Sequence, residues 1–487
     1  MSDQSLQRFQ VFINGQWRNP RSDKWIESVN PATEEAWCEV PNCQEDDVND
    51  AVAAAVSALN GPWAQFSPVE RGRVLTRLAE AIPDHADRLA ELEVSDSGKN
   101  MTESRNFMKF CAGFFKFFGE MADKSTGSTF VTPFPGIQTY THRVPVGVVA
   151  AVIPWNNPLW LLSIKLGPAL AGGNTCIIKP SELCATPLLE IVKIMHEVAD
   201  IPDGVVNILT GEGDPCGRVL TSHPDVSKVA FTGGPETARH IVRNTANNLA
   251  ETTLELGGKS PMIVFDDADM DNAVQNIIAG VFAGSSGQSC VAGSRAFVQR
   301  GIYDAFVSNL VKAAEALKVG DPLSSESQMG PLASLAQIER CENAVSDALD
   351  SGAKLRTGGK RPDYLKKGWY FEPTILEIED HDIDIAQTEL FGPVLVIMPF
   401  DNEQEVVKLA NDTNFGLAAG FFTTNLGRAL RLTKSVRAGI QWVNTYRLGA
   451  PMAPIGGFGD SGKSREGGLE AMHEYTKPVT VWINTNI

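Results

Sequence analysis

The chain lacks the signals of several large protein classes. Its 487 residues hold 42 Lys and Arg against 59 Asp and Glu, which gives a net charge of −17. No basic tract is present to displace counterions from nucleic acid. No apolar run is long enough to span a bilayer, and the polar start, Met1 to Arg8, lacks the apolar region of a signal peptide. We therefore expect a cytoplasmic protein with neither a nucleic-acid nor a membrane partner.

Cysteine and histidine are also sparse. The 8 Cys and 7 His form no CxxC pair and no cluster at metal-ligand spacing. This distribution favours free thiols and predicts neither a disulfide framework nor a metal site. The chain has 43% hydrophobic and 21% charged residues, as a globular protein does, and its length suits two or three domains.

The first part of the chain begins with a hairpin pattern. Residues 9–17 alternate and then turn at Asn14-Gly15, a dipeptide typical of hairpins. Residues near 46–60 and 68–93 follow helical periodicity. A stripe of phenylalanines at helical spacing over 107–118 predicts a further helix, for which core packing is the favoured role over ligand binding.

Apolar runs, each followed by a turn and a helical pattern, recur through the middle of the chain. The alternation is typical of a parallel sheet with crossover helices. A second α/β unit is expected over about 258–460. Two strand-like stretches, 139–144 and 477–484, could each be an edge strand. The apolar runs are 146–153, 175–178, 205–209, 228–231 and 262–265.

Two glycine-bracketed segments supply a carboxylate and a thiol. Glu255 lies in Leu-Glu-Leu-Gly-Gly-Lys, and Cys290 follows Gly-Gln-Ser among small residues that leave its sulfur accessible. Covalent acyl transfer requires a nucleophile and a base of these kinds. Taken singly, Glu255 also fits a capping carboxylate and Cys290 a buried structural thiol.

Together these segments resemble the active-site motifs of the aldehyde dehydrogenase superfamily, and the resemblance extends from the first strand signal to the C-terminus. It implies a Rossmann-like cofactor domain, a second α/β catalytic domain and a small β element that bridges subunits. A homodimer or homotetramer is expected. The implied bounds are 1–124 and 146–257 for the NAD-binding domain, 258–460 for the catalytic domain, and 125–145 and 470–487 for the bridging element.

The resemblance also implies a dinucleotide site at the carboxyl ends of the first sheet. Lys179 and Glu182 would contact the adenosine ribose, and Glu182 would disfavour NADP by repelling its 2′-phosphate, so NAD is the expected cofactor. One departure is Gly234, where the family usually has a serine hydroxyl for the pyrophosphate; backbone N–H groups at the next helix start remain available. The other implied cofactor residues are Ile153, Trp155, Gly211, Phe231, Thr232, Gly233, Leu256, Glu389 and Phe391.

By the same resemblance, Cys290 attacks an aldehyde and Glu255 activates the water that hydrolyses the thioester. The side chain of Asn156 and the Cys290 N–H would form the oxyanion hole. Spacing alone does not separate Asn156 from Asn157; the family pattern selects Asn156. Lys165 and Glu466 match a proton relay, although an exposed salt bridge is the commoner role for such residues.

Asn157, Trp160 and Ile455 are expected to line the substrate tunnel with part of the 107–118 helix. An apolar tunnel with one amide suits a medium-chain or aromatic aldehyde better than a dicarboxylate semialdehyde. One rival is a CoA-acylating semialdehyde dehydrogenase, which needs no deacylating base. Others are a catalytically retired homologue and a phosphorylating enzyme, for which only Arg295 adjoins Cys290 as an anion-binding group.

Overall fold

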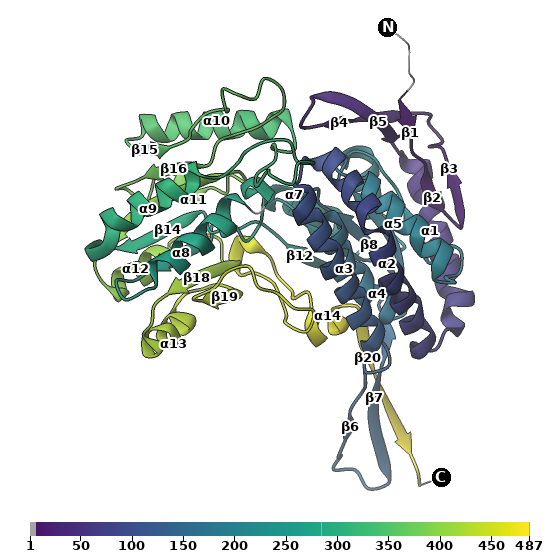
Figure 1. Ribbon diagram of the computed structural model, residues 1–487. Helices are drawn as coiled ribbons and strands as arrows, with labels where there is room; N and C mark the ends of the chain where they lie inside the picture. The colour runs from purple at the N-terminus through teal and green to yellow at the C-terminus, as the bar shows by residue number, and fades with distance from the viewer. Residues whose placement is uncertain (1–5, 284, 487) are drawn as a thin grey trace.

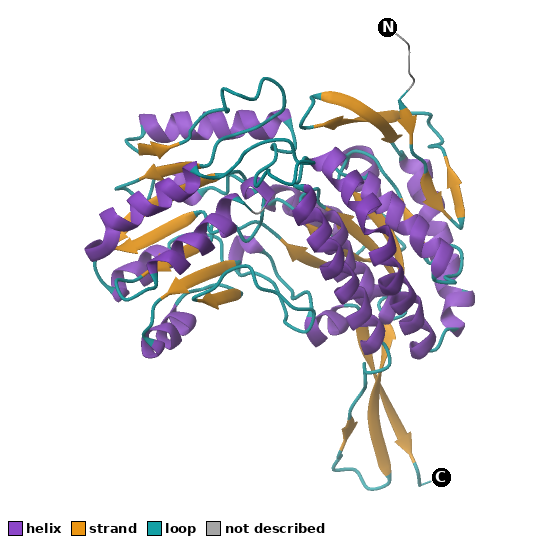
Figure 2. Ribbon diagram, viewed as in Figure 1, coloured by secondary structure: helices purple, strands orange, loops and turns teal. Residues whose placement is uncertain are grey.

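The computed structural model describes residues 6–283 and 285–486. Two seven-stranded sheets, each flanked by helices, form two lobes, and a three-stranded sheet projects away from them (Figures 1 and 2). Most strands in the two large sheets run parallel, because helical crossovers connect them. The predicted α/β class is confirmed.

The first large sheet carries a parallel block extended by an antiparallel hairpin. Asn14 and Gly15 both have positive φ at the hairpin turn, as the dipeptide predicts. In sheet order its strands are β12 (Glu251–Glu255), β11 (Val226–Thr232), β8 (Val148–Ile153), β9 (Thr175–Pro180), β10 (Val206–Ile208), β2 (Val11–Ile13) and β3 (Gln16–Arg18).

Helices cover this sheet, and α2 and α3 pack closely against each other (Figure 1). The predicted helix 68–93 runs on to Ser97, because the left-handed Gly98 (φ 72°) is the residue that ends it. The helices of this lobe are α1 (Glu45–Asn60), α2 (Pro68–Ser97), α3 (Met101–Met121), α4 (Pro158–Ala171), α5 (Thr186–Val198), α6 (Arg218–Ser222) and α7 (Pro235–Thr245).

The second large sheet includes the last of the predicted apolar runs, 262–265. Its strands, in sheet order, are β15 (Lys354–Thr357), β16 (Thr374–Glu377), β17 (Val394–Phe400), β14 (Arg295–Gln299), β13 (Pro261–Val264), β18 (Ala418–Phe422) and β19 (Ile440–Val443). Its helices are α8 (Met270–Ile277), α9 (Tyr303–Glu315), α10 (Leu335–Asp350), α11 (Asp384–Gln387), α12 (Glu403–Asn411) and α13 (Leu426–Ser435).

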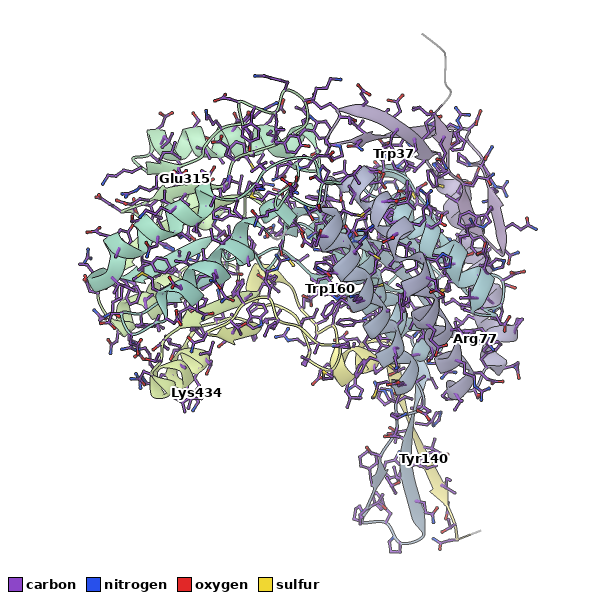
Figure 3. All side chains as sticks on the ribbon, in the orientation of Figure 1. Trp37, Arg77, Tyr140, Trp160, Glu315 and Lys434 are labelled. Carbon is purple, nitrogen blue, oxygen red and sulfur yellow. The ribbon has the colours of Figure 1, made fainter. Side chains whose placement is uncertain are left out.

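The projecting sheet has the order β20 (Thr476–Asn484), β7 (Ile137–Pro145) and β6 (Thr129–Phe130). Figure 3 labels Tyr140 of β7 on this projection. The edge-strand interpretation holds for β20, whose Pro478 has no N–H to donate, but it is wrong for β7. The two-residue β6 pairs with the free side of β7 and is too short to leave a pattern in the sequence. Helix α14 (Gly468–Glu474) precedes β20.

A further small sheet, β1 (Gln7–Arg8), β5 (Glu35–Pro41) and β4 (Trp25–Asn30), lies beside α2. None of the helices in the described part of the chain combines the length and the apolar character needed to cross a bilayer. The phenylalanine stripe of α3 is divided between two roles. Phe115 and Phe118 are buried in the core, as predicted, whereas Phe107 and Phe110 line a cavity.

Candidate active site

The two lobes meet at a cavity of about 120 Å³, which we call the thiol cavity. Glu255 ends β12, Asn156 lies between β8 and α4, and Cys290 precedes β14. Its wall also includes the predicted Asn157, Trp160, Leu256, Ile455 and Glu466. Figure 3 labels Trp160 on the first lobe, on the side facing the second lobe.

Close backbone approach holds Cys290 beside the Glu255 segment. A Cβ at Gly258 would lie 2.6 Å from the Cys290 carbonyl oxygen, so a larger residue would push the two segments apart. The Asn156 amide donates to the Gln288 carbonyl over 3.0 Å. The Asn157 side-chain oxygen accepts instead from Lys99. The amide next to the thiol segment is therefore that of Asn156.

Cys290 is partly exposed, whereas the other cysteines are buried, and all eight are free thiols. Desolvation raises the pKa of the Cys290 thiol to about 12, with the carboxylates of Glu389 and Glu255 adding to the shift and Arg447 opposing it. In the free protein at neutral pH, this sulfur is held as a thiol. A nearby base must therefore remove its proton before it attacks.

Glu255 is buried, and its Oε1 has no hydrogen-bond partner among the described residues. Desolvation and the neighbouring Glu466 carboxylate raise its pKa well above the usual range, against the opposing charge of Lys165. Lys165 donates to Glu466, and both side chains are fully buried. The exposed salt-bridge alternative for this pair is therefore wrong. The two charges of this buried pair act on the pKa of Glu255 in opposite directions: Glu466 raises it and Lys165 lowers it.

A groove of about 580 Å³ opens at the carboxyl ends of β8, β9 and β11. Its lining includes the predicted Trp155, Lys179, Glu182, Phe231, Thr232, Gly233 and Gly234. Gly234 caps α7, and a Cβ there would meet open space. Ile153 is buried in the sheet and Gly211 packs against Cys216 and Cys43, so these two lie behind the groove wall.

A smaller hollow of about 200 Å³ connects the groove to the thiol cavity and is lined by Cys290, Thr232, Glu389 and Phe391. Glu389 accepts from the Gly258 N–H over 2.8 Å, and desolvation raises its pKa to about 7. Phe391 meets Trp155 edge to face at 5.4 Å between ring centroids. Glu389 is therefore a partly buried acceptor within the site.

The sequence analysis missed one charged member of the thiol cavity. Arg447 lines it, whereas only an amide was expected among the polar groups. Arg447 has a left-handed backbone (φ 60°) in the loop after β19, a conformation that its sequence neighbours do not announce. The one indication in the sequence that Arg447 could line the cavity was that it lies shortly before the predicted Ile455 segment.

Arg295, the expected anion-binding neighbour of Cys290, points elsewhere. Its guanidinium is buried and donates to the carbonyls of Lys259, Leu409 and Ala410. It also lies 3.0 Å from Nε2 of His381. Within the described residues, the one His/Asp group that is close enough for a metal consists of His381, Asp382 and Asp412. The adjacent guanidinium opposes a cation there.

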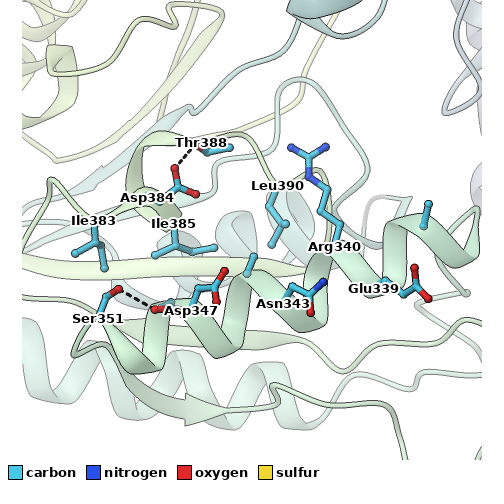
Figure 4. Close-up of a pocket in the computed structure, with 13 residues that line it drawn as sticks. Glu339, Arg340, Asn343, Asp347, Ser351, Ile383, Asp384, Ile385, Thr388 and Leu390 are labelled. Atoms are coloured by element: carbon cyan, nitrogen blue, oxygen red, sulfur yellow. Dashed lines mark hydrogen bonds between the residues drawn. The ribbon is translucent and has the colours of Figure 1, made fainter.

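A polar hollow of about 610 Å³ lies on the second lobe, between α10 and the α11 segment (Figure 4). Hydrogen bonds within it join Thr388 to Asp384 and Ser351 to Asp347. Among the described residues that line it, none is a sequence-predicted site residue. Arg340 links its rim to the site by donating to the Glu389 carbonyl over 2.6 Å.

Comparison with known proteins gives the same family throughout. The model of the aldehyde dehydrogenase family matches residues 17–481. A (Z)-2-((N-methylformamido)methylene)-5-hydroxybutyrolactone dehydrogenase from Acinetobacter baylyi is 46% identical over 98% of this chain and 97% of its own. The betaine aldehyde dehydrogenase of Bacillus subtilis is 39% identical over 98% and 97%.

Solved structures agree in fold. The betaine aldehyde dehydrogenase of Staphylococcus aureus in complex with NAD+ superposes with a TM-score of 0.96 at 36% identity, over 98% of this chain and 95% of that one. The NAD+ complex of an aldehyde dehydrogenase from Bacillus cereus gives 0.96 at 39% identity, over 98% and 97%. The resemblance seen in the Glu255 and Cys290 motifs is thereby confirmed, and the chain belongs to the aldehyde dehydrogenase family.

Proposed function

We propose that this protein oxidises an aldehyde to a carboxylic acid with NAD as the acceptor. The observation that carries the proposal is the meeting of Cys290, Asn156 and Glu255 in one cavity, which joins a dinucleotide-sized groove at Thr232. The NAD+ complexes of the two solved relatives support the choice of cofactor.

The residues of the groove fit a dinucleotide. Lys179 and the exposed Glu182 face it from the end of β9 and the turn that follows, as a ribose requires. The N-terminus of α7 begins after Gly234 and offers N–H groups to a pyrophosphate. The buried Thr232 hydroxyl has no partner among the described residues. Glu182 would repel a 2′-phosphate, so NAD is favoured over NADP.

The first half of the reaction takes place at Cys290. Glu255 accepts the thiol proton, because its raised pKa makes it a strong enough base. The sulfur then bonds to the aldehyde carbon, and the Asn156 amide and the Cys290 N–H hold the resulting oxyanion. NAD bound in the groove would supply the hydride acceptor. As the oxyanion reforms the carbonyl, the C–H bond of the former aldehyde breaks and its hydrogen leaves with the electron pair, so that Cys290 carries a thioester.

The second half releases the acid. Glu255 first gives up the thiol proton that it accepted. It then takes a proton from water, the hydroxide adds to the thioester carbon, and the Cys290 sulfur leaves as a thiolate. The proton must then leave Glu255 before the next cycle. The buried pair Lys165 and Glu466 lies beside it and is proposed as the route.

The Phe and Trp side chains of the thiol cavity support a medium-chain or aromatic aldehyde as substrate. The Acinetobacter relative is named for a functionalised hydroxybutyrolactone. We propose residues 1–124 and 146–257 as the cofactor domain and 258–460 as the catalytic domain. The projecting element, 125–145 and 470–487, would join subunits in a dimer or tetramer.

The test is NADH formation from a panel of aliphatic, aromatic and semialdehyde substrates, with NAD but without CoA or phosphate. Turnover supports the hydrolytic reaction. Turnover that requires CoA would establish the acylating alternative, and turnover that requires phosphate the phosphorylating one. If no turnover is seen under any of these conditions, including with NADP in place of NAD, the protein is a catalytically retired homologue.

A further inference from the structure

The thiol cavity has a buried end and an open end. Glu466 at one end is 0% exposed, whereas Leu448 is 67% exposed and marks the mouth. Arg447 adjoins Leu448 in the chain, and its side chain is 19% exposed. The guanidinium therefore lies at the mouth, away from the carboxylates of the floor.

Only part of the hydrogen-bonding capacity of the Arg447 guanidinium is used by the protein itself. Its Nη1 donates to the Ala279 carbonyl over 3.2 Å. Its Nη2 forms an ion pair with Glu103, at 3.6 Å from Oε1, which is longer than a hydrogen bond. The Glu103 carboxylate is already engaged, since it accepts from both the N–H and the hydroxyl of Ser285. A guanidinium carries five N–H donors, so Arg447 has donors beyond the one that the Ala279 carbonyl accepts.

Trp160 is a second, independent donor in the same wall. Its ring packs against Phe107 and Phe110, with centroids 6.1 and 5.8 Å away. Its Nε1 is buried and has no hydrogen-bond partner among the described residues. A buried N–H without a partner costs free energy that a ligand oxygen would recover.

We propose that the aldehyde oxidised here carries a second oxygen acceptor, a carbonyl or a carboxylate, at the end remote from the aldehyde, and that Arg447 binds it. This inference rests on the proposed function and narrows its substrate class. An aromatic or apolar middle would lie against Phe107, Phe110 and Trp160. Glu103 offsets part of the guanidinium charge, so a neutral carbonyl and a carboxylate are both compatible.

The test compares three aldehydes of one shape: benzaldehyde, 4-formylbenzamide and 4-formylbenzoate. With the wild-type enzyme and NAD, we expect kcat/KM to be roughly 10- to 100-fold higher for at least one of the two acceptor-bearing aldehydes than for benzaldehyde, as a hydrogen bond to a charged group gives. Arg447→Met should remove this advantage, measured as the ratio of kcat/KM between the acceptor-bearing aldehyde and benzaldehyde, because loss of the charge that opposes the Cys290 pKa shift affects both substrates alike. The loss should appear in KM more than in kcat, because the contact is remote from the reacting carbon.

The comparison of the two acceptors identifies the charge that the site selects. Trp160→Phe keeps the ring but removes the N–H, and should lower the advantage by roughly 2- to 10-fold. Arg447→Lys keeps the charge with fewer donors and should retain part of the preference; it replaces Arg447→Met if that variant fails to fold. Arg361→Met is the matched control, because Arg361 pairs with Glu342 on the surface.

An equal kcat/KM for all three aldehydes in the wild type, or a preference that survives Arg447→Met, would overturn the inference. Failure of the proposed function looks different. In that case the wild type would form no NADH from benzaldehyde either.

Discussion

The thiol cavity and the groove meet at Thr232, but the cavity buries its carboxylates whereas the groove leaves Glu182 exposed to water. The cavity has about 120 Å³ and encloses Glu255 and Glu466 among aromatic and aliphatic side chains. The groove has about 580 Å³, and its Glu182 is exposed to water. Burial raises the pKa of both cavity carboxylates. In the proposed function, the same type of side chain therefore serves as the base in the cavity and as an exposed carboxylate facing the cofactor in the groove.

The difference shows how one chain separates chemistry from recognition. A base near a thiol gains strength from a dry environment, because desolvation disfavours its charged form. A binding groove for a large polar cofactor needs solvated acceptors and open backbone N–H groups. Each region can therefore be disturbed on its own.

Removal of the cavity nucleophile has the largest expected effect. Cys290→Ala should lower the rate of NADH formation by roughly 10,000-fold or more, since no sulfur remains to form the thioester. NAD binding, followed by quenching of protein fluorescence, should persist because the groove is intact. Cys38→Ala is the control, as Cys38 is buried in β5. A Cys290→Ala enzyme that still gave a burst of NADH would refute the nucleophile assignment.

Loss of the base affects the second half of the reaction more than the first. Glu255→Gln should lower steady-state turnover by roughly 100- to 10,000-fold. A rapid first turnover should remain, provided that added base or higher pH removes the thiol proton. Stopped-flow measurement of NADH separates the two phases. Normal steady-state turnover would exclude Glu255 as the hydrolytic base.

In the proposed function, the buried pair Lys165 and Glu466 beside Glu255 shapes the pH dependence of the rate. A protonated Glu255 accepts no proton, so the rate should rise with pH through its raised pKa. Glu466→Gln removes the like charge that raises this pKa and should shift the acid limb to lower pH. Lys165→Met should shift it in the opposite direction. Profiles of kcat against pH test both predictions. An unchanged acid limb in both variants would mean that this pair does not affect the titration of Glu255.

The smallest expected effect is that of Gly234→Ser, which adds a hydroxyl to the groove. Gly234→Ser meets open space at Cβ and gives α7 a better capping residue. The KM for NAD should fall by roughly 2- to 10-fold, with kcat unchanged, if the hydroxyl reaches the pyrophosphate. Initial-rate kinetics at saturating aldehyde provide the measurement. A higher KM would mean that the bare backbone of Gly234 is itself required.

The sequence was most informative where local pattern and chemistry coincide. The hairpin at Asn14-Gly15, the parallel strands and the motifs around Glu255 and Cys290 each depend on neighbours in the chain. Arg447 was missed because it reaches the cavity through a left-handed loop conformation and a contact with Ala279, far away in sequence. The two-residue β6 was missed because two residues show no alternation. The burial of Lys165 with Glu466 depends on packing between distant segments, which composition does not reveal.

The central claim is that Cys290 carries the acyl group and Glu255 releases it. The most direct measurement is mass spectrometry of Glu255→Gln after it is mixed with NAD and benzaldehyde at raised pH, where the Cys290 thiol loses its proton without Glu255, and quenched in acid. We predict a peptide containing Cys290 with the added mass of one benzoyl group, absent when NAD is omitted. NADH formation with no adduct on that peptide, or with an adduct on another residue, would contradict the account.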